Sequence, residues 1–240
     1  FFAANIREIS LVIVMIVIAV FVEYRSGGNF LTAENLSDMF AETSVLAICA
    51  VGMMFVMVTG GIDLSIGAIM ALGAMAGCTV LKNNPGIPTI AVVAIAMAVG
   101  IVSGFFNGVL VSKLKILPII ATLGTMNIYR GITYLVANGS WVKQQEMGAG
   151  FLSLATGKVL GINNLIMIAV AVYIIAAFFM TQTRTGRKIY AVGNSEESAR
   201  VSGIKTDNTL ILVYTLLGVI AGLAGTLYVC KYGVAQGETC

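Results

Sequence analysis

The sequence has 240 residues, of which 58% are apolar and only 10% are charged. A soluble globular domain carries roughly 25% charged residues, so this composition excludes an ordinary soluble protein. With a mean hydropathy of +0.96, no histidine and a net charge of +3, the chain has neither the charge of a nucleic-acid-binding surface nor the polarity of a disordered region. The composition therefore predicts a polytopic protein in a lipid bilayer, with room for about seven spans.

Charge-free intervals divide the chain into candidate spans. The first, Ile9–Val22, is short for a bilayer crossing. Six more follow, of which Ile116–Val142 is interrupted by Arg130. These six intervals are long enough for a 30 Å hydrocarbon layer, and they are Thr43–Ile62, Leu64–Leu81, Thr89–Ser112, Ile116–Val142, Val159–Thr183 and Asn208–Cys230. Because lipid offers no partners to backbone groups and the intervals lack the alternation of a barrel strand, we expect an all-α transmembrane helical bundle. Residues 1–240 then form a single transmembrane domain.

The distribution of lysine and arginine between the spans indicates the orientation. Placing Arg7 inside puts eight basic residues on the inner side and five on the outer side, with Arg130 left uncounted. The loop from Arg184 to Lys205 is the most basic and decides the assignment. We therefore expect a cytoplasmic N-terminus, a cytoplasmic loop over residues 184–205, and a long outer loop from Gly139 to Lys158.

Several glycines repeat at intervals of four residues, which leaves one face of a helix bare and allows two backbones to approach closely. They are Gly73 and Gly77, then Gly100, Gly104 and Gly108, and finally Gly218 and Gly222. This spacing predicts close helix–helix packing. A face that lines a pathway or slides during a transition is the alternative.

The stretch Thr59–Gly67 joins two spans and contains Asp63. A carboxylate at mid-membrane costs roughly 2.5–3.5 kcal/mol or more, so Asp63 must lie at a helix end, face water or be paired. Gly60 and Gly61 permit a sharp turn, and both Asp63 and Ser65 can cap the helix that follows. Two interpretations stay open: a tight capped hairpin, or an element of a substrate pathway or its inner gate.

Polar residues also follow the fourth span. Thr122 and Thr125 share one face of a helix that begins near Pro118, and their hydroxyls either bond back to that helix or line a pathway. Arg130 needs a carboxylate, carbonyl groups or a water-filled cavity within the span, or it reaches to the outer interface. Asn107 and Asn127 supply amides that can hydrogen-bond a polar solute.

Three blocks of sequence resemble the permease subunits of bacterial sugar ABC importers of the ribose, xylose, arabinose and galactose type. The blocks occur in the family's order and spacing, and they are Val58–Gly67, then Phe106–Pro118 with Ala121–Gly131, and Arg184–Asn194 with Ala199–Ile204. They reach from the second span to the seventh. The match is therefore specific to the family, although not to one sugar.

The resemblance implies an inner-membrane subunit that pairs with a second permease copy or a close relative. It also implies a periplasmic sugar-binding protein and cytoplasmic ATP-binding cassette subunits as partners, with alternating access at the dimer interface. ATP and Mg would then bind the cassette, so this chain would be a transport subunit without enzymatic activity or a cofactor of its own. In agreement, the sequence contains no GxxxxGK[ST] phosphate loop. The resemblance further implies that the family's C-terminal spans are missing from these 240 residues.

The loop over residues 184–205 is expected to couple the permease to the cassette. After a basic run that includes Arg187, the segment 194–203 reads as a short helix capped by Asn194 and a capping box to Glu197. Glu196 and Arg200 suit the helix dipole, and Gly203 supplies a left-handed stop. Such a helix is marginal alone and needs a docking partner, and the resemblance runs through Gly193, Asn194, Ala199, Arg200 and Gly203. A basic anchor without a partner is the alternative.

A stand-alone secondary transporter or channel is the second candidate function. Apart from Asp63 and Arg130 the spans are free of charge, which leaves little for a proton relay. No HExxH or GxSxG motif occurs, and no cluster of acidic, histidine or cysteine residues predicts a metal site. The sequence therefore favours the importer permease, with pathway or gate candidates Gly60, Gly61, Asp63, Ser65, Asn107, Thr122, Thr125, Asn127 and Arg130.

Overall fold

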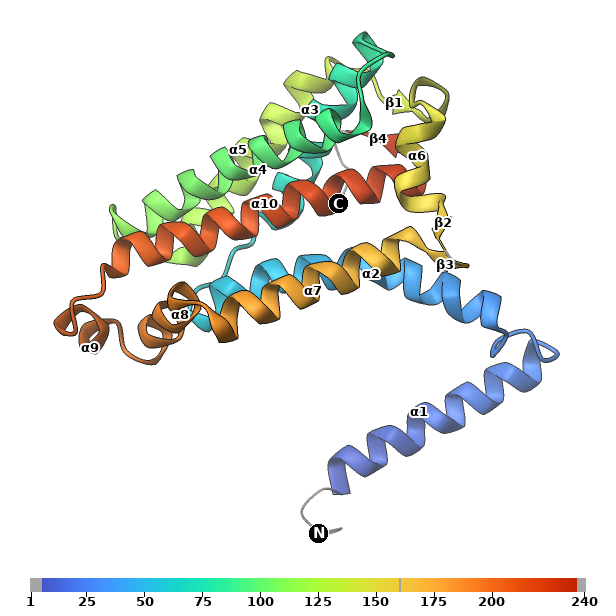
Figure 1. The fold of residues 1–240 in the computed structure, drawn as a ribbon, viewed down its shortest axis with the longest axis horizontal. Helices are drawn as coiled ribbons and strands as arrows, with labels where there is room; N and C mark the ends of the chain where they lie inside the picture. Colours follow the sequence, from blue (N-terminus) through green and yellow to red (C-terminus); the bar gives the residue numbers. More distant parts are fainter. Residues whose placement is uncertain (1–5, 160, 237–240) are drawn as a thin grey trace. The chain divides into compact units, whose positions relative to one another are not determined.

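The computed structural model describes residues 6–159 and 161–236 of a chain whose described part is mainly helical (Figure 1). The chain divides into two compact units, residues 1–43 and residues 44–240. Helix α2 (Ala33–Val58) belongs to both. Each unit is described by itself.

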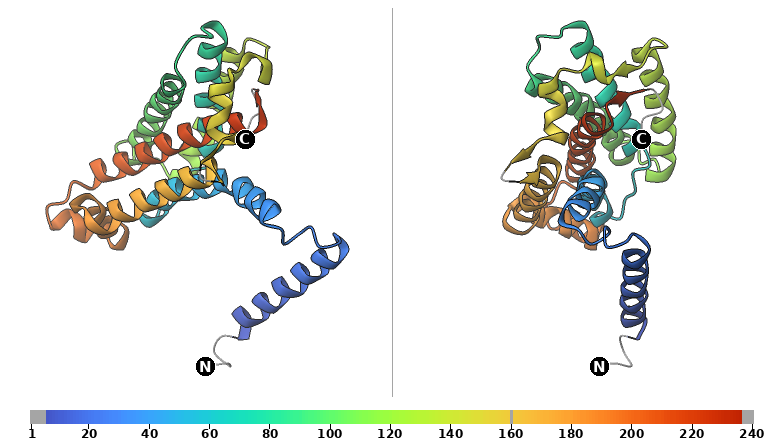
Figure 2. Two further views of the ribbon diagram at one scale, coloured as in Figure 1. Left: turned by 45° about the vertical axis from the view of Figure 1, so that its right-hand side comes forward. Right: turned by 90° about the vertical axis from the view of Figure 1, so that its right-hand side faces the viewer.

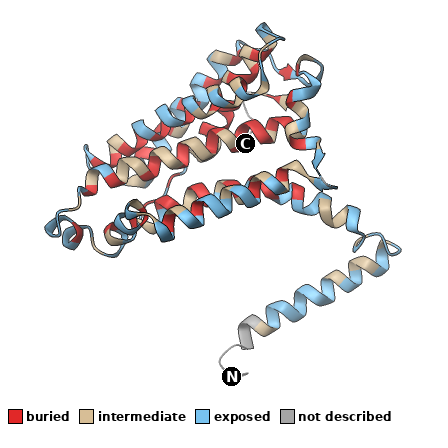
Figure 3. Ribbon diagram, viewed as in Figure 1, coloured by how far each residue is buried: buried red, intermediate tan, exposed pale blue. Residues whose placement is uncertain are grey.

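The first unit contains α1 (Ile6–Arg25) and the start of α2. The turn between them is held by side chains, since Glu23 Oε2 accepts a hydrogen bond from the Leu31 N–H at 2.8 Å. The large apolar side chains from Leu11 to Phe21 are more than half exposed, and Figure 3 shows α1 coloured as exposed over most of its length. An apolar helix without a polar face is suited to a lipid environment, and the first span itself stays a prediction.

The second unit is a helical bundle, and each predicted span from residue 43 onward coincides largely with one helix. Besides the rest of α2, these helices are α3 (Ile66–Asn83), α4 (Thr89–Ser112), α5 (Pro118–Ala137), α7 (Asn164–Gln182) and α10 (Thr206–Tyr232). Among the described residues, five helices are long and apolar enough to cross a membrane, namely α2, α3, α4, α7 and α10. The helical bundle is therefore confirmed, whereas the count of seven spans stays a prediction.

Helix α10 is the core of this bundle and packs most extensively against α4 and then α3 (Figures 1 and 2). The contact with α4 is made by backbone. A Cβ atom on Gly100 would overlap the carbonyl oxygen of Gly218, and one on Gly104 would overlap that of Tyr214. The close packing predicted from the glycine spacing is confirmed at this pair of helices.

The segment expected as a long outer loop contains short elements that hydropathy does not reveal. Strand β1 (Val142–Lys143) pairs antiparallel with β4 (Val234–Ala235), and β2 (Lys158–Val159) pairs with β3 (Ile162–Asn163). Between the two pairs lie the 3₁₀ helix η1 (Gln144–Glu146) and α6 (Ala149–Thr156). The β1–β4 pairing ties this segment to the residues that follow α10.

Glu146 fastens the same segment to the end of α3. Its carboxylate accepts the Lys143 N–H at 2.9 Å and lies 2.9 Å from the Lys82 ammonium. These two contacts, the backbone hydrogen bond first, hold the pKa of Glu146 below its ordinary value.

The predicted coupling loop folds into two helices, α8 (Arg184–Asn194) and α9 (Glu196–Val201). The prediction that Asn194 caps the second helix is wrong. Asn194 is the last residue of α8, so the extended backbone that a cap requires first occurs at Ser195, whose Oγ accepts the Ser198 N–H at 3.1 Å. Glu197 is therefore not in a capping-box position relative to Asn194.

The predicted left-handed stop at Gly203 is confirmed, with φ of +81°. The Gly203 N–H donates to the Arg200 carbonyl and the Ile204 N–H donates to the Ala199 carbonyl, both at 3.0 Å. This pair of bonds is a Schellman motif. The Arg200 guanidinium also contacts Glu196 one turn earlier at 2.6 Å, which supports this short helix.

Candidate functional site

The connection between α2 and α3 has the sharp turn that its glycines predict. Gly60 has φ of +78°, a conformation that side chains disfavour. Gly61 is required for a different reason, because a Cβ atom there would lie 2.8 Å from the Tyr214 hydroxyl of α10. The connection therefore depends on both glycines, one for conformation and one for space.

Asp63 lies in this connection and is fully buried, yet its carboxylate is satisfied. Oδ1 accepts the Ser65 N–H at 2.7 Å and the Ser65 hydroxyl at 2.6 Å, while Oδ2 accepts the Asn107 amide at 2.9 Å. Asp63 thus caps the turn before α3 and not α3 itself, which begins at Ile66, so the predicted helix cap at Asp63 is not observed. The prediction that the Ser65 side chain caps α3 is wrong, because its hydroxyl donates to the carboxylate, which is the stronger type of hydrogen bond.

The hydrogen bonds of Asp63 extend into a buried polar network. Asn107 of α4 also donates to Ser65 Oγ at 2.8 Å, and its Oδ1 lies 3.0 Å from the Tyr129 hydroxyl of α5. That hydroxyl is 2.9 Å from the Ser103 carbonyl of α4. The network therefore joins the α2–α3 connection to α4 and α5. Sequence reasoning missed Tyr129, although it follows Thr125 by four residues and so shares its helix face.

Thr122 and Thr125 occupy the same inward face of α5, as predicted. Thr122 Oγ1 accepts the Leu64 N–H at 3.2 Å and donates to the Pro118 carbonyl at 2.8 Å. Thr125 donates back to the Thr122 carbonyl at 3.2 Å. Both side chains are buried, and the Thr122 hydroxyl fastens α5 to the connection, whereas the Thr125 hydroxyl bonds back within α5.

Asn127 and Arg130 lie on the opposite side of α5 from the two threonines. Both are exposed, together with Gly124 and Gly131, beside which no other atom lies within 4 Å of a hypothetical Cβ. We call these four residues the exposed α5 face. The structure therefore separates the predicted pathway residues into a buried network and an exposed face.

Residues from the first two sequence blocks line one pocket of about 220 Å³ together with Glu196, which lies between the two parts of the third block, and we call it the motif pocket. The α2–α3 connection, the α4–α5 loop, α9 and α10 contribute to it, and its lining includes Thr59, Gly60, Gly61, Lys115, Pro118, Glu196 and Tyr214. The buried Tyr214 hydroxyl has no hydrogen-bond partner among the described residues. Nothing in the local sequence indicates that Tyr214 reaches this place.

The loop that carries α8 and α9 contacts several membrane helices, and two of these contacts involve residues of the predicted coupling set. A Cβ atom on Gly193 would overlap the Val58 carbonyl oxygen, so the end of α8 lies directly against the end of α2. Ala199 of α9 is buried, whereas Arg187, Asn194 and Glu197 are exposed.

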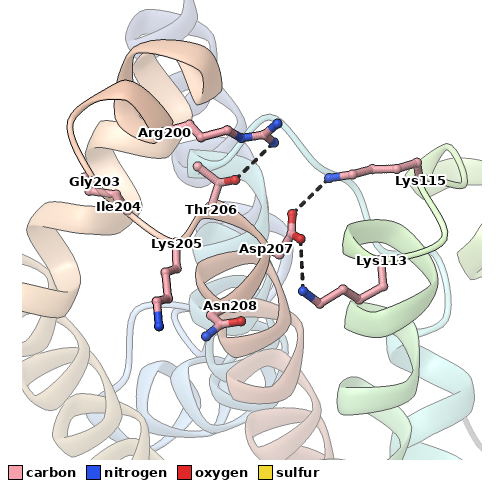
Figure 4. A pocket seen from close by; sticks show the side chains of 9 residues that line it. All are labelled: Lys113, Lys115, Arg200, Gly203, Ile204, Lys205, Thr206, Asp207 and Asn208. Atoms are coloured by element: carbon pink, nitrogen blue, oxygen red, sulfur yellow. Dashed lines mark hydrogen bonds and ion pairs between the residues drawn. The ribbon is translucent and has the colours of Figure 1, made fainter.

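The second contact is a group of charges around Asp207, which sequence reasoning missed. The ammonium groups of Lys113 and Lys115 each lie 3.0 Å from its carboxylate (Figure 4), and Lys115 is also 3.8 Å from Glu196. The α4–α5 loop is thereby tied to α9 and to the first turn of α10.

Comparison with known proteins agrees with this arrangement. The chain is 40% identical over 213 residues to the ribose import permease protein RbsC of Escherichia coli K12, covering 87% of this chain and 65% of the relative. It is 34% identical over 211 residues to the autoinducer 2 import system permease protein LsrC of Yersinia pseudotuberculosis, covering 88% of this chain and 59% of the relative. The Salmonella typhi LsrC protein is 32% identical over 238 residues, which are 99% of this chain and 67% of that relative.

The chain thus spans about two thirds of the length of these relatives. No solved structure gives a significant match. Residues 35–239 match the family described as the permease component of the branched-chain amino acid transport system. With its apolar helices, the chain is therefore a multi-pass membrane protein that belongs to this permease family.

Proposed function

We propose that this chain is the membrane-spanning part of an ATP-driven importer that passes a monosaccharide or a similar small polyol into the cytoplasm. A periplasmic binding protein delivers the solute, and ATP and Mg bind a separate cassette subunit. The observation that carries the proposal is the motif pocket, where the α2–α3 connection, the α4–α5 loop and α9 meet. A cassette that moves α9 would act directly on the other two elements.

In this proposal the cytoplasmic loop transmits force through Gly193 and Val58. Because no side chain separates α8 from the end of α2, a displacement of α8 reaches the Gly60 turn with little loss. The Asp63 network holds α3, α4 and α5 together on the other side of this turn. The turn would therefore be the hinge of an inner gate, with Asp63 and Ser65 as its anchor.

The route for the solute is proposed to run along the exposed α5 face, at an interface with a second permease copy. Asp63, Asn107, Thr122 and Thr125 are buried within one copy, whereas Asn127 offers an amide on the outside of the bundle. Gly124 and Gly131 leave space on either side of that amide. A second copy facing this surface would enclose a polar channel that neither copy forms alone.

A neutral polyol suits this face better than an amino acid. An amino acid carries both charges, so its recognition needs an anionic group as well as a cationic one, and the exposed α5 face supplies Arg130 but no carboxylate. The names of two relatives, which refer to import of ribose and of autoinducer 2, also support a sugar or a related compound.

The test is uptake into proteoliposomes that contain the whole permease with its cassette subunit and binding protein. We expect ATP-dependent uptake of a radiolabelled pentose or hexose that excess leucine does not inhibit. Uptake without ATP would instead indicate a secondary transporter or channel. Inhibition by leucine would place the substrate with the amino acids named in the family description.

A further inference from the structure

A second pocket of about 440 Å³ lies where α8 and α10 meet, and it is lined by Thr185, Lys188, Gly203, Lys205, Asn208, Thr209 and Leu212. We call it the headgroup pocket. It contains two lysines and no carboxylate. Within the part of the chain that the structure describes, neither lysine forms an ion pair or a side-chain hydrogen bond.

In the neighbouring pocket of Figure 4, by contrast, the other basic side chains have acidic partners. There, Lys113 and Lys115 bind Asp207, and Arg200 binds Glu196. Lys205 belongs to both pockets, but Figure 4 shows its side chain extending away from Asp207, on the side of Asn208. Among the described residues, no carboxylate neutralises the positive charge of the headgroup pocket.

The polar groups that accompany the lysines suit an anion. Thr185 lies in the first turn of α8, while Asn208 and Thr209 lie in the first turn of α10. The amino ends of two helices, where backbone dipoles favour negative charge, thus converge on the same pocket as the two ammonium groups. The Thr185 hydroxyl and the Asn208 amide add donors that have no other partner among the described residues.

The depth of the pocket in the membrane identifies the source of the anion. α10 is apolar enough to cross a bilayer and begins at Thr206, so the lysine end of the pocket lies at the level where phospholipid headgroups lie. Leu212, one turn further along the same helix face than Asn208, provides an apolar wall on the bilayer side. α8 is amphipathic, with Ile189 and Val192 buried against the bundle and Arg187 and Lys188 exposed on the other face.

We propose that the headgroup pocket binds the phosphate of an anionic phospholipid, with Lys188 and Lys205 as the charged ligands and Leu212 beside the start of an acyl chain. This lipid would hold α8 in place at the membrane surface beside α10. The inference needs only the membrane location of the helices and is independent of the transported solute.

The test measures binding of phosphatidylglycerol to the whole permease by native mass spectrometry after release from nanodiscs. We expect the wild-type protein to retain phosphatidylglycerol in preference to phosphatidylcholine. The Lys188→Gln/Lys205→Gln variant should lose about 30-fold in affinity, because each basic residue near an anionic surface contributes roughly a factor of five. Lys188→Arg/Lys205→Arg should retain most of the binding, which separates loss of charge from loss of fold.

The matched control is Lys143→Gln/Lys158→Gln, which removes the same charge from exposed residues of the β1 and β2 strands. An equal loss of lipid in this control would overturn the proposal, because it would reveal general surface attraction. Equal retention of the two lipids by the wild type would also overturn it. If inorganic phosphate or an added cassette subunit displaced the lipid fully, the pocket would belong to a soluble anion or to a protein contact, and the lipid assignment would be wrong.

Discussion

The Asn107 amide of α4 donates to the Asp63 carboxylate of the α2–α3 connection at 2.9 Å, and both side chains are fully buried. The hydrogen bonds that described neighbours make to Asp63 are all donated to it. This is the arrangement that a deprotonated carboxylate satisfies. An acidic residue in an apolar bundle is thereby retained without a cationic partner.

Asp63→Asn should destabilise the permease by about 1–3 kcal/mol, because the new amide would direct a donor at the Asn107 amide and leave buried groups unpaired. Transport should fall with it. The measurement is thermal unfolding in detergent together with uptake. Wild-type stability and uptake in this variant would show that the charge of Asp63 has no part in either.

The exchange variant Asp63→Asn/Asn107→Asp provides the control for that substitution. It restores a donor opposite an acceptor, and the carboxylate introduced on α4 would still accept from the Tyr129 hydroxyl, so we expect it to recover part of the lost stability. Additive losses in the two single variants and no recovery in the exchange variant would contradict a direct interaction.

Gly104→Ala should destabilise the protein by about 1–3 kcal/mol, because its Cβ atom meets the Tyr214 carbonyl and pushes α4 from α10. Gly124→Ala is the matched control on a neighbouring helix. Nothing lies within 4 Å of its Cβ, so helix propensity should leave it unchanged or stabilise it by about 0.5–1 kcal/mol. Equal unfolding midpoints for the two variants would contradict the backbone contact.

Gly193→Ala should uncouple ATP hydrolysis from transport, because the added methyl group separates α8 from Val58. We expect the reconstituted complex to keep its basal ATPase rate and to lose most of the stimulation by substrate-loaded binding protein. Gly86→Ala, which adds a methyl group where no atom lies within 4 Å, serves as the control. Full stimulation in Gly193→Ala would remove this contact from the proposed path of force.

The contacts of Glu146 with the Lys143 N–H and with Lys82 predict a pH dependence. The pKa of Glu146 is lower in the folded chain than its ordinary value of 4.5, so its contribution to stability is complete above that value and is lost as the pH falls through the folded pKa. Glu146→Gln should therefore unfold at a lower temperature than the wild type at pH 7, and the difference should vanish in acid. A difference that persists unchanged in acid would assign the effect to packing.

The predicted topology is tested by single cysteines placed in a cysteine-free background. Positions 84 and 145 should react with an impermeant thiol reagent added from the periplasmic side, whereas position 196 should react only after permeabilisation. This result follows from the excess of basic residues on the inner side. Reaction of position 196 in intact cells would contradict the predicted orientation and place the loop over residues 184–205 outside.

Much of the fold could be predicted because a helix that crosses a lipid bilayer requires a long run of residues without charge. The bounds of α4 agree at both ends with the charge-free interval, Thr89–Ser112, since Pro88 precedes the helix and Lys113 follows it. α8 was missed as a helix because a polar amphipathic segment leaves no trace in a search for charge-free runs. The error at Asn194 followed directly, because the cap of α9 depends on where α8 ends.

The candidate site was only partly predictable. Periodicity within one helix correctly paired Thr122 with Thr125, but it could not show which face of α5 points inward. The orientation of α5 buries these two residues and exposes Asn127. It depends on contacts of α5 with Leu64 and Asn107, which are distant in sequence. Tyr214 and Asp207 belong to α10, which is distant from these segments in the sequence. Only the tertiary structure brings Tyr214 to the motif pocket and Asp207 to the α4–α5 loop.

The glycine contact between α4 and α10 also determines which parts of the bundle can move. Where the backbones of α4 and α10 touch, no side chain lies between them that could change rotamer when one helix is displaced. We therefore expect the two helices to move as one rigid unit. A change in the tilt of α10 would then carry α4 with it, and the Lys113–Asp207 ion pair also links α10 to the start of the α4–α5 loop. In the proposed transport cycle the two helices would move as one unit, and the Gly60 turn is the connection that lies next to the end of α8.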